Sequence, residues 1–332
     1  MKDVAKLAGV SQTTVSFVFN DMPDMGIPDE TKERVWEAVK ELGYRPNILA
    51  QNLRRQRSGL LGFITDEIAT TPYAGKIIEG AQDIAWEHGK ILLMVNTKDN
   101  QEIKDAAIEM LLKHQVEGII YATMYHRSVN IPDTLREVPT VLLDCYVEDR
   151  SLPSVVPEEE EGAFAATQYL IEKGHRRIGF INHRVDIPAT RMRLEGYKKA
   201  LKKVNIPLDD DLIRLVEADA ETEGAYDQTM ALMQLSEPPT AIFSFNDRTA
   251  LGTYDALRKL GLDIPKDVAV MGFDNQELIS ARLYPPLSTM ELPHYRMGEW
   301  AANKLIKLIN GEDDNLLIQH KLGCPLVERK SV

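Results

Sequence analysis

From residue 59 onward the sequence alternates between short apolar runs and amphipathic segments, and this alternation limits the fold more than any other feature. The apolar runs are GLLGFIT, ILLMVN, GIIYAT, TVLLD, RIGFIN, AIFSF and VAVMGFD. Runs without polar alternation are typical of strands buried on both faces of a parallel sheet. The pattern therefore predicts a doubly wound α/β body that is long enough for two lobes.

Amphipathic segments between these runs predict helices at about 75–88, 159–173, 189–204, 247–260 and 295–310. Most of them are followed by a glycine, which can adopt the left-handed conformation that ends a helix. These glycines are Gly89, Gly174, Gly261 and Gly311. The helix at 189–204 stops instead just before Pro207.

Ligands of doubly wound sheets lie beyond the carboxyl ends of the strands, so the polar residues that follow the apolar runs form a candidate site. Asp66, Asp144, Asn246 and Asp274 are among them, and no nucleophile–base pair accompanies them. Asn and Asp exchange hydrogen bonds with hydroxyl groups, which suits binding of a sugar or nucleoside rather than bond cleavage. For any one of them, a helix cap or a turn is the commoner role.

The segment at residues 3–20, DVAKLAGVSQTTVSFVFN, predicts two short helices joined by a turn. Gly9 interrupts the first helical pattern, and Ser11 can cap the second helix. The spacing predicts that Val15, Val18 and Phe19 pack on Val4, Leu7 and Ala8.

The opposite face of that second helix is short, polar and almost uncharged. Its members are Thr13, Ser16, Phe17 and Asn20. Such a face suits the DNA major groove, where amides, hydroxyls and apolar rings contact base edges and thymine methyl groups. A helical hairpin that only packs is the alternative.

A third helix is predicted at about residues 28–42, with Gly43 as its cap and Pro46 beyond it. Residues 47–57, NILAQNLRRQR, hold too few apolar side chains to form a stable isolated helix, so we expect marginal helicity until a partner binds. Their arginine cluster favours DNA as that partner, and a plain interdomain linker fits equally well.

The formal net charge of −12 argues at first against a nucleic-acid partner. However, residues 1–57 hold nine Lys and Arg against eight Asp and Glu, so the acidity belongs to the remainder of the chain. An acidic body is repelled by DNA and would confine contact to the N-terminal part.

Other features of the composition exclude several classes of protein. Cys145 and Cys324 are the only cysteines, and no charged and then apolar leader or long apolar run is present. We therefore expect a reduced cytoplasmic protein without a disulfide, a signal peptide or a membrane segment. No Gly-rich phosphate loop follows the first strand and no His/Cys group has metal spacing, so we expect no cofactor, no metal and no enzyme.

Four segments appear in the order found in the LacI/GalR family of bacterial transcription regulators, which the chain resembles along essentially its whole length. They are DVAKLAGVSQTTVSFVFN, GYRPNILAQNLRR, SFNDRTALG and MGFDN. The resemblance implies a homodimer whose two helix-turn-helix heads bind near-palindromic operator DNA. It also implies a periplasmic-binding-protein-like body that senses a small effector, with a carbohydrate as the first expectation.

The resemblance further implies domain limits: an all-α helix-turn-helix head at 1–46, a hinge at 47–57 and an effector-binding and dimerisation body at 58–332. Within the body, lobe one would comprise about 58–157 and 290–320, and lobe two about 158–289 and 321–332.

Site residues are carried over by matching position. Gln12, Thr13 and Phe17 would face bases, and the residues expected to grip phosphates and bases are Ser11, Thr14, Ser16, Asn20, Thr31 and Tyr44. Leu53 matches a leucine that wedges into the minor groove and kinks the operator, accompanied by Asn47, Ala50 and Arg54. The expected effector-binding residues are Tyr73, Met124, Glu158, Arg193, Asn246 and Asp274.

Three positions depart from the family pattern. Phe17 stands where many relatives carry a basic or imidazole side chain, and Ala220 stands where relatives often place a ring that stacks on the effector. Pro157 occupies the place of an effector-contacting acid, which leaves Glu158 as the substitute. The sequence therefore predicts a pocket without naming its occupant, and both induction and corepression remain open. A solute-binding protein or an α/β sugar-processing enzyme would share the body and are the alternatives.

Overall fold

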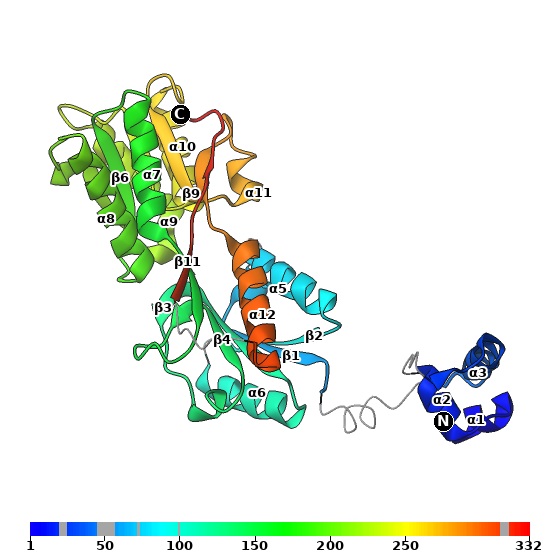
Figure 1. Cartoon of the computed structure of the whole chain (residues 1–332). Helices are drawn as coiled ribbons and strands as arrows, with labels where there is room; N and C mark the ends of the chain where they lie inside the picture. The colour runs from blue at the N-terminus through cyan, green and yellow to red at the C-terminus, as the bar shows by residue number, and fades with distance from the viewer. Residues whose placement is uncertain (20–24, 45–56, 72–73, 99, 313–318) are drawn as a thin grey trace. The chain divides into compact units, whose positions relative to one another are not determined.

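The computed structural model describes residues 1–19, 25–44, 57–71, 74–98, 100–312 and 319–332. The chain forms two compact units, Met1–Ser58 and Gly59–Val332, which we call the head and the body (Figure 1).

The described residues of the head form three α-helices, α1 (Lys2–Ala8), α2 (Gln12–Phe19) and α3 (Asp29–Glu41). The backbone N–H of Thr14 donates to Ser11 Oγ at 3.0 Å, which caps α2 as predicted. Val4, Val15 and Val35 from the three helices form the buried core. Leu7 is 47% exposed, so its predicted place in this core is wrong, because α1 turns its Val4 and Ala8 side inward.

The body contains two six-stranded sheets. The strands of the first sheet are β1 (Leu60–Thr65), β2 (Ile91–Asn96), β3 (Gly118–Ser128), β4 (Thr140–Tyr146), β5 (Ser154–Pro157) and β11 (Gln319–Leu322). Those of the second sheet are β6 (Ile178–His183), β7 (Ile213–Val216), β8 (Ala241–Ser244), β9 (Ala269–Asp274), β10 (Ser288–Glu291) and β12 (Leu326–Val327).

The body's α-helices are α5 (Gly75–Glu87), α6 (Gln101–Lys113), α7 (Glu159–Glu172), α8 (Pro188–Lys203), α9 (Glu221–Met233), α10 (Asp247–Leu260), α11 (Glu277–Ser280) and α12 (His294–Asn310). Short 3₁₀ segments are Ile68–Thr70, Asp133–Leu135, Asp210–Leu212 and Ala218–Ala220. No helix in the described residues is long and apolar enough to cross a membrane.

The two sheets share one topology. The first has the order β11-β5-β4-β3-β1-β2 and the second the order β12-β10-β9-β8-β6-β7. All pairings are parallel except that of β10 with β12. The predicted doubly wound body with two lobes is therefore confirmed, and we call the lobe built on each sheet lobe one and lobe two.

The chain passes between the lobes more than once. It leaves the first sheet after β5, returns to lobe one with α12, and enters the second sheet again at β12. Figure 1 shows α12, drawn in orange, beside α5, drawn in cyan, although the two helices come from opposite ends of the body. The later crossings follow Glu291 and Leu322, where β10 and β11 end.

One predicted strand differs in its environment. The run ILLMVN does form β2, but its residues are partly or fully exposed, whereas those of β1 are nearly all buried. The cause is its position, because β2 is an edge strand that pairs only with β1. The prediction that every apolar run is buried on both faces is wrong for this strand.

Candidate functional site

A cavity lies at the carboxyl ends of strands from both lobes. It has a volume of about 140 Å³, and we call it the inner cavity. Lobe one contributes residues in the last part of β3 and β4, and lobe two contributes residues at or after the ends of β6, β8 and β9. The polar residues that line it are Tyr125, His126, Asp144, Glu159, His183, Arg193, Glu221, Asn246, Arg248, Asp274 and His294.

The topology explains why a cavity forms there. In each lobe the strand order reverses direction beside the first strand, between β1 and β3 in lobe one and between β6 and β8 in lobe two. The connections on either side of such a switch point run to opposite faces of the sheet, which leaves a crevice beyond the strand ends.

Arg193, on α8, joins three elements of lobe two at this edge. Its Nε donates to Glu159 Oε2 at 2.7 Å, and its Nη2 donates to Asp274 Oδ1 at 3.2 Å. Its Nη1 donates to the backbone oxygen of Phe245, and the guanidinium lies 3.7 Å from the ring centroid of Phe273. Arg193 is only 2% exposed, so its charge is neutralised inside the protein rather than by solvent.

Electrostatics keeps this arginine charged. Burial alone would lower the pKa of Arg193, but the carboxylates of Glu159 and Asp274 outweigh it and raise the pKa above its usual value. Burial raises the pKa of Asp274, and the positive charge of Arg193 opposes that rise. Asp274 also has a φ of 97°, a conformation that costs energy for a residue other than glycine and that clusters at functional sites.

A second polar group in lobe two is centred on Glu221, at the start of α9. Asn246 Nδ2 donates to Glu221 Oε2 at 2.9 Å, and His183 Nε2 lies 3.2 Å from the same oxygen. Arg248 Nε donates to Glu221 Oε1. Asn246 also caps α10, because its Oδ1 accepts the backbone N–H of Thr249 at 2.8 Å. Asn246 therefore combines the common capping role with a place in the cavity wall.

Burial alone would raise the pKa of Glu221, but hydrogen bonds from His183, Arg248 and Asn246 outweigh it and lower the pKa to about 2. A depressed folded-state pKa contributes stability that is complete above the unfolded-state pKa of about 4.3 and is lost as the pH falls towards the folded value.

We therefore expect Glu221→Gln to lower the free energy of unfolding at pH 6, with a difference from the wild type that shrinks by about 2–3 kcal/mol between pH 5 and pH 2.5. Denaturant unfolding across this range measures it. The matched control is Glu217→Gln, whose ion pair with Arg184 is more than half exposed on both sides. A Glu221→Gln difference that is the same at all pH values would contradict the assignment.

The lobe-one side of the cavity is built on Asp66, which follows β1. Its Oδ1 accepts the backbone N–H of Met124 at 2.9 Å, and its Oδ2 accepts from Arg127 Nη2 at 2.9 Å. These bonds hold the distal part of β3 against β1. Beyond them lie His126 and Asp144, both buried and both lining the cavity.

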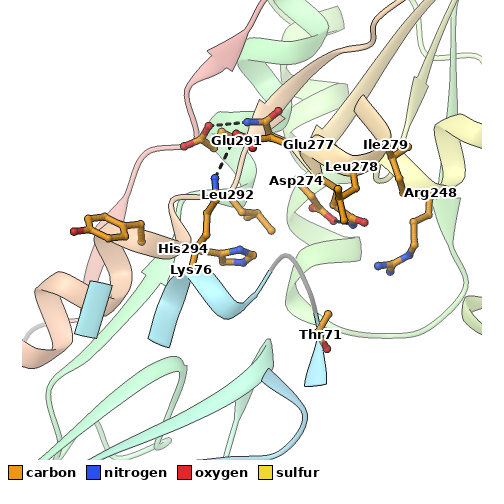
Figure 2. Close-up of a pocket in the computed structure, with 13 residues that line it drawn as sticks. Thr71, Lys76, Arg248, Asp274, Glu277, Leu278, Ile279, Glu291, Leu292 and His294 are labelled. Carbon is orange, nitrogen blue, oxygen red and sulfur yellow. Dashed lines mark hydrogen bonds and ion pairs between the residues drawn. The ribbon is translucent and has the colours of Figure 1, made fainter. Parts of the chain in front are cut away.

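A larger outer cavity of about 520 Å³ adjoins the inner one and shares Arg248, Asp274, Leu292 and His294 with it. Figure 2 shows that its wall combines Thr71 and Lys76 of lobe one with α11 of lobe two. Lys76 Nζ and Glu277 Oε1 form an exposed ion pair between the lobes at 3.4 Å. The outer cavity is therefore the open mouth of the same cleft.

The structure brings together four of the expected effector-binding residues, because Met124, Arg193, Asn246 and Asp274 all line the inner cavity. Glu158 does not line the inner cavity, but it lines a smaller adjoining cavity with His126 and Glu159. Helix α7 begins one residue later and places Glu159 against Arg193 instead. Tyr73 lies outside the described residues.

Sequence reasoning missed several members of this wall. Three of them could not be predicted from the pattern of the sequence, namely Glu159, His183 and Glu221. His183 is the last residue of β6, and Glu221 is the first residue of α9. His126 was not predicted because β3 extends beyond GIIYAT, the apolar run that predicts this strand. Ala220 does not line the inner cavity, whereas its neighbour Ala218 does.

In the head, Ser11, Gln12 and Thr13 are exposed at the start of α2, and Thr14, Phe17, Thr31 and Tyr44 are partly exposed. Ser16 is only 8% exposed, so its expected place on the open face of α2 is wrong, because it follows Val15 towards the core. The expected DNA contacts outside the described residues are Asn20, Asn47, Ala50, Leu53 and Arg54.

The inner cavity is chemically suited to binding. Its groups are carboxylates, guanidiniums, an amide and imidazoles, which can donate hydrogen bonds to a polar ligand and accept hydrogen bonds from it. No group of three or more His, Cys, Asp or Glu in the described part of the chain could hold a metal ion.

Comparison with known proteins matches both units. Residues 1–47 match the family described as bacterial regulatory proteins, lacI family, and residues 58–328 match periplasmic binding proteins and sugar binding domain of LacI family. The chain is 33% identical over 334 residues to the HTH-type transcriptional repressor PurR of Vibrio atlanticus, covering 100% of this chain and 98% of that protein.

It is 35% identical over 311 residues to the ribose operon repressor of Escherichia coli K12, covering 93% of this chain and 92% of that protein. The crystal structure of the lac repressor dimer bound to operator and the anti-inducer ONPF aligns with a TM-score of 0.80 at 28% identity, covering 99% of this chain and 97% of that one. The chain therefore belongs to the lacI family of bacterial regulatory proteins.

Proposed function

We propose that this regulator represses transcription by binding operator DNA as a homodimer, and that a small molecule in the inner cavity controls its affinity for that DNA. The proposal depends on the combination of two parts in one chain. The head matches the lacI family, and the body contains a cavity lined by residues of both lobes. Family membership makes the protein a transcription regulator rather than an enzyme.

The exposed start of α2 supports the DNA-binding role. In helix-turn-helix proteins the N-terminal residues of the second helix contact base edges in the major groove. Ser11, Gln12 and Thr13 are exposed there, and their amide and hydroxyl groups suit contacts to bases and phosphates. In this proposal, residues 1–46 read the operator DNA and residues 58–332 bind the effector. The hinge at 47–57 contributes a minor-groove contact through Leu53.

Exposed apolar side chains on lobe one support a homodimer. Trp86, at the end of α5, is 72% exposed, and Ile91 and Met94 on the edge strand β2 are 54% and 43% exposed. These side chains belong to two elements in contact, α5 and β2, and large exposed apolar side chains are typical of interaction surfaces. A dimer would set two heads on two half-sites of a near-palindromic operator. We accordingly place the protein in the bacterial cytoplasm, where operator DNA lies.

The lobes provide the means of control. A ligand that contacts both lobes binds one arrangement of the cleft better than another, and each tenfold difference in affinity shifts the equilibrium by about 1.4 kcal/mol. The resulting change in lobe one would alter the hinge that precedes it. Whether ligand favours or disfavours DNA depends on which arrangement it prefers.

Selection from random double-stranded DNA with the full chain tests the DNA-binding half of this proposal. We expect recovery of near-palindromic sites whose binding weakens steeply with salt, because Lys and Arg displace counterions from phosphates. Recovery of no enriched site, or of sites without twofold symmetry, would contradict the proposal.

A further inference from the structure

Among the described residues, two buried side chains that line the inner cavity carry polar atoms without a hydrogen-bond partner. His126, on β3, is 4% exposed, and Asp144, on β4, is 6% exposed. Within the residues that the structure describes, neither ring nitrogen of His126 nor Oδ1 of Asp144 has a hydrogen-bond partner. Buried polar atoms in folded proteins are nearly always hydrogen-bonded, so atoms left without a partner in a cavity wall point to a ligand.

The charge of this wall limits that ligand. Glu159, Glu221 and Asp274 line the inner cavity, and these three carboxylates outnumber its two guanidinium groups. Both guanidiniums are also engaged already, that of Arg193 with Glu159 and Asp274, and that of Arg248 with Glu221. Among the described residues, a phosphate or carboxylate in the cavity would therefore meet a net negative wall in which both guanidiniums already pair with carboxylates.

His126 adds no positive charge at neutral pH, because burial lowers its pKa to about 4. A neutral imidazole has one nitrogen that donates and one that accepts a hydrogen bond. A hydroxyl group can satisfy either nitrogen and can also donate to Asp144 Oδ1, whereas a phosphate oxygen can only accept.

We infer that the inner cavity selects a polyhydroxylated ligand without an anionic group, and that His126 and Asp144 are the lobe-one residues that bind its hydroxyls. The inference rests on the proposed function, because it concerns the effector site of that regulator. An unphosphorylated monosaccharide fits this chemistry, and its phosphorylated form does not.

The test compares matched neutral and phosphorylated sugars on the full chain. Ribose, glucose and fructose are each paired with ribose 5-phosphate, glucose 6-phosphate and fructose 6-phosphate, and binding is measured by thermal shift and by titration calorimetry at pH 7.5. We expect at least one neutral sugar to bind, and its phosphate to bind at least tenfold more weakly. No binding by any neutral sugar, or a phosphate that binds as tightly as its neutral form, would overturn the inference.

Two histidine variants separate a ligand contact from a general effect. We expect His126→Ala to weaken binding of that neutral sugar at least tenfold. His114→Ala should bind it as the wild type does, because His114 is exposed at the end of α6 and does not line the cavity. Unfolding without ligand shows whether each variant is folded. If folding is disturbed by His126→Ala, His126→Asn replaces it and should lower affinity as well. Wild-type affinity in a folded His126 variant would overturn the role of this residue.

Operator binding is measured on the same preparations. A chain that binds a palindromic operator but fails the sugar tests would leave the proposed DNA-binding function standing and remove only the inference. A chain that selects no operator fails the proposed function itself, whatever the sugars do.

Discussion

Arg193→Ala is expected to lower the free energy of unfolding of the body by about 3–5 kcal/mol, the usual cost of removing one partner of a buried ion pair. The substitution leaves the side chains of Glu159 and Asp274, which are 4% and 7% exposed, without their counter-charge. It also removes the link from α8 to the backbone oxygen of Phe245. Denaturant unfolding followed by circular dichroism measures the loss.

The matched control lies two residues earlier on the same helix. Arg191 pairs with Asp186 at the surface, where the two side chains are 57% and 80% exposed. Exposed pairs contribute about 0–1 kcal/mol, so Arg191→Ala should change stability by no more than that. Equal losses for the two variants would show that the buried network does not hold this edge of lobe two together.

Gly298→Ala is expected to destabilise lobe one by about 3 kcal/mol, at the upper end of the cost of overpacking a core. A Cβ atom at position 298 on α12 would lie 2.0 Å from the backbone oxygen of Ile77 on α5. Gly80 makes the reciprocal approach, because its Cβ would lie 2.1 Å from the backbone oxygen of Tyr295. Both obstacles are backbone atoms, so the two helices must move apart.

Gly75→Ala is the control for this substitution. Gly75 begins α5, and a Cβ atom there would have no atom within 4 Å. Replacing such a glycine usually changes stability by less than about 1 kcal/mol and often increases it, because the unfolded chain loses freedom. Thermal unfolding of the two variants should therefore differ clearly. A wild-type melting temperature for Gly298→Ala would show that α5 and α12 pack less closely than the structure indicates.

The sequence predicted the main layers of the fold because the long apolar runs and the helix-ending glycines report local structure directly. Gly261 and Gly311, with φ values of 72° and 69°, end α10 and α12 as predicted. The elements that were not predicted include the helices α6 and α9 and short strands such as β7 and β12. Such strands carry too few residues for an apolar period to stand out.

The sequence predicted those site residues that lie at the end of a strand or directly after it. Asn246 and Asp274 come together because the carboxyl ends of parallel strands meet at one edge of the second sheet. The run Glu158–Glu161 shows the limit, because four identical residues cannot reveal which of them faces the cleft. The start of α7 at Glu159 decides this, and that boundary depends on tertiary packing.

His126 was hidden for a different reason. The register between β3 and β4 shifts between Ala122 and Arg127, so the simple alternation of faces fails in that part of the strand. His126 is therefore buried although the sequence around it is polar.

Occupancy of the inner cavity should change the affinity of the head for operator DNA, and one titration tests this most directly. The full chain is titrated against its selected operator with and without a saturating sugar that thermal shift has identified. We expect at least a fivefold change in operator affinity, at the lower end of allosteric coupling. The change should disappear in Ala218→Trp, which places an indole in the cavity wall, and persist in Val204→Trp, which alters an exposed residue outside it. Equal operator affinity with and without bound sugar would contradict control through this cavity.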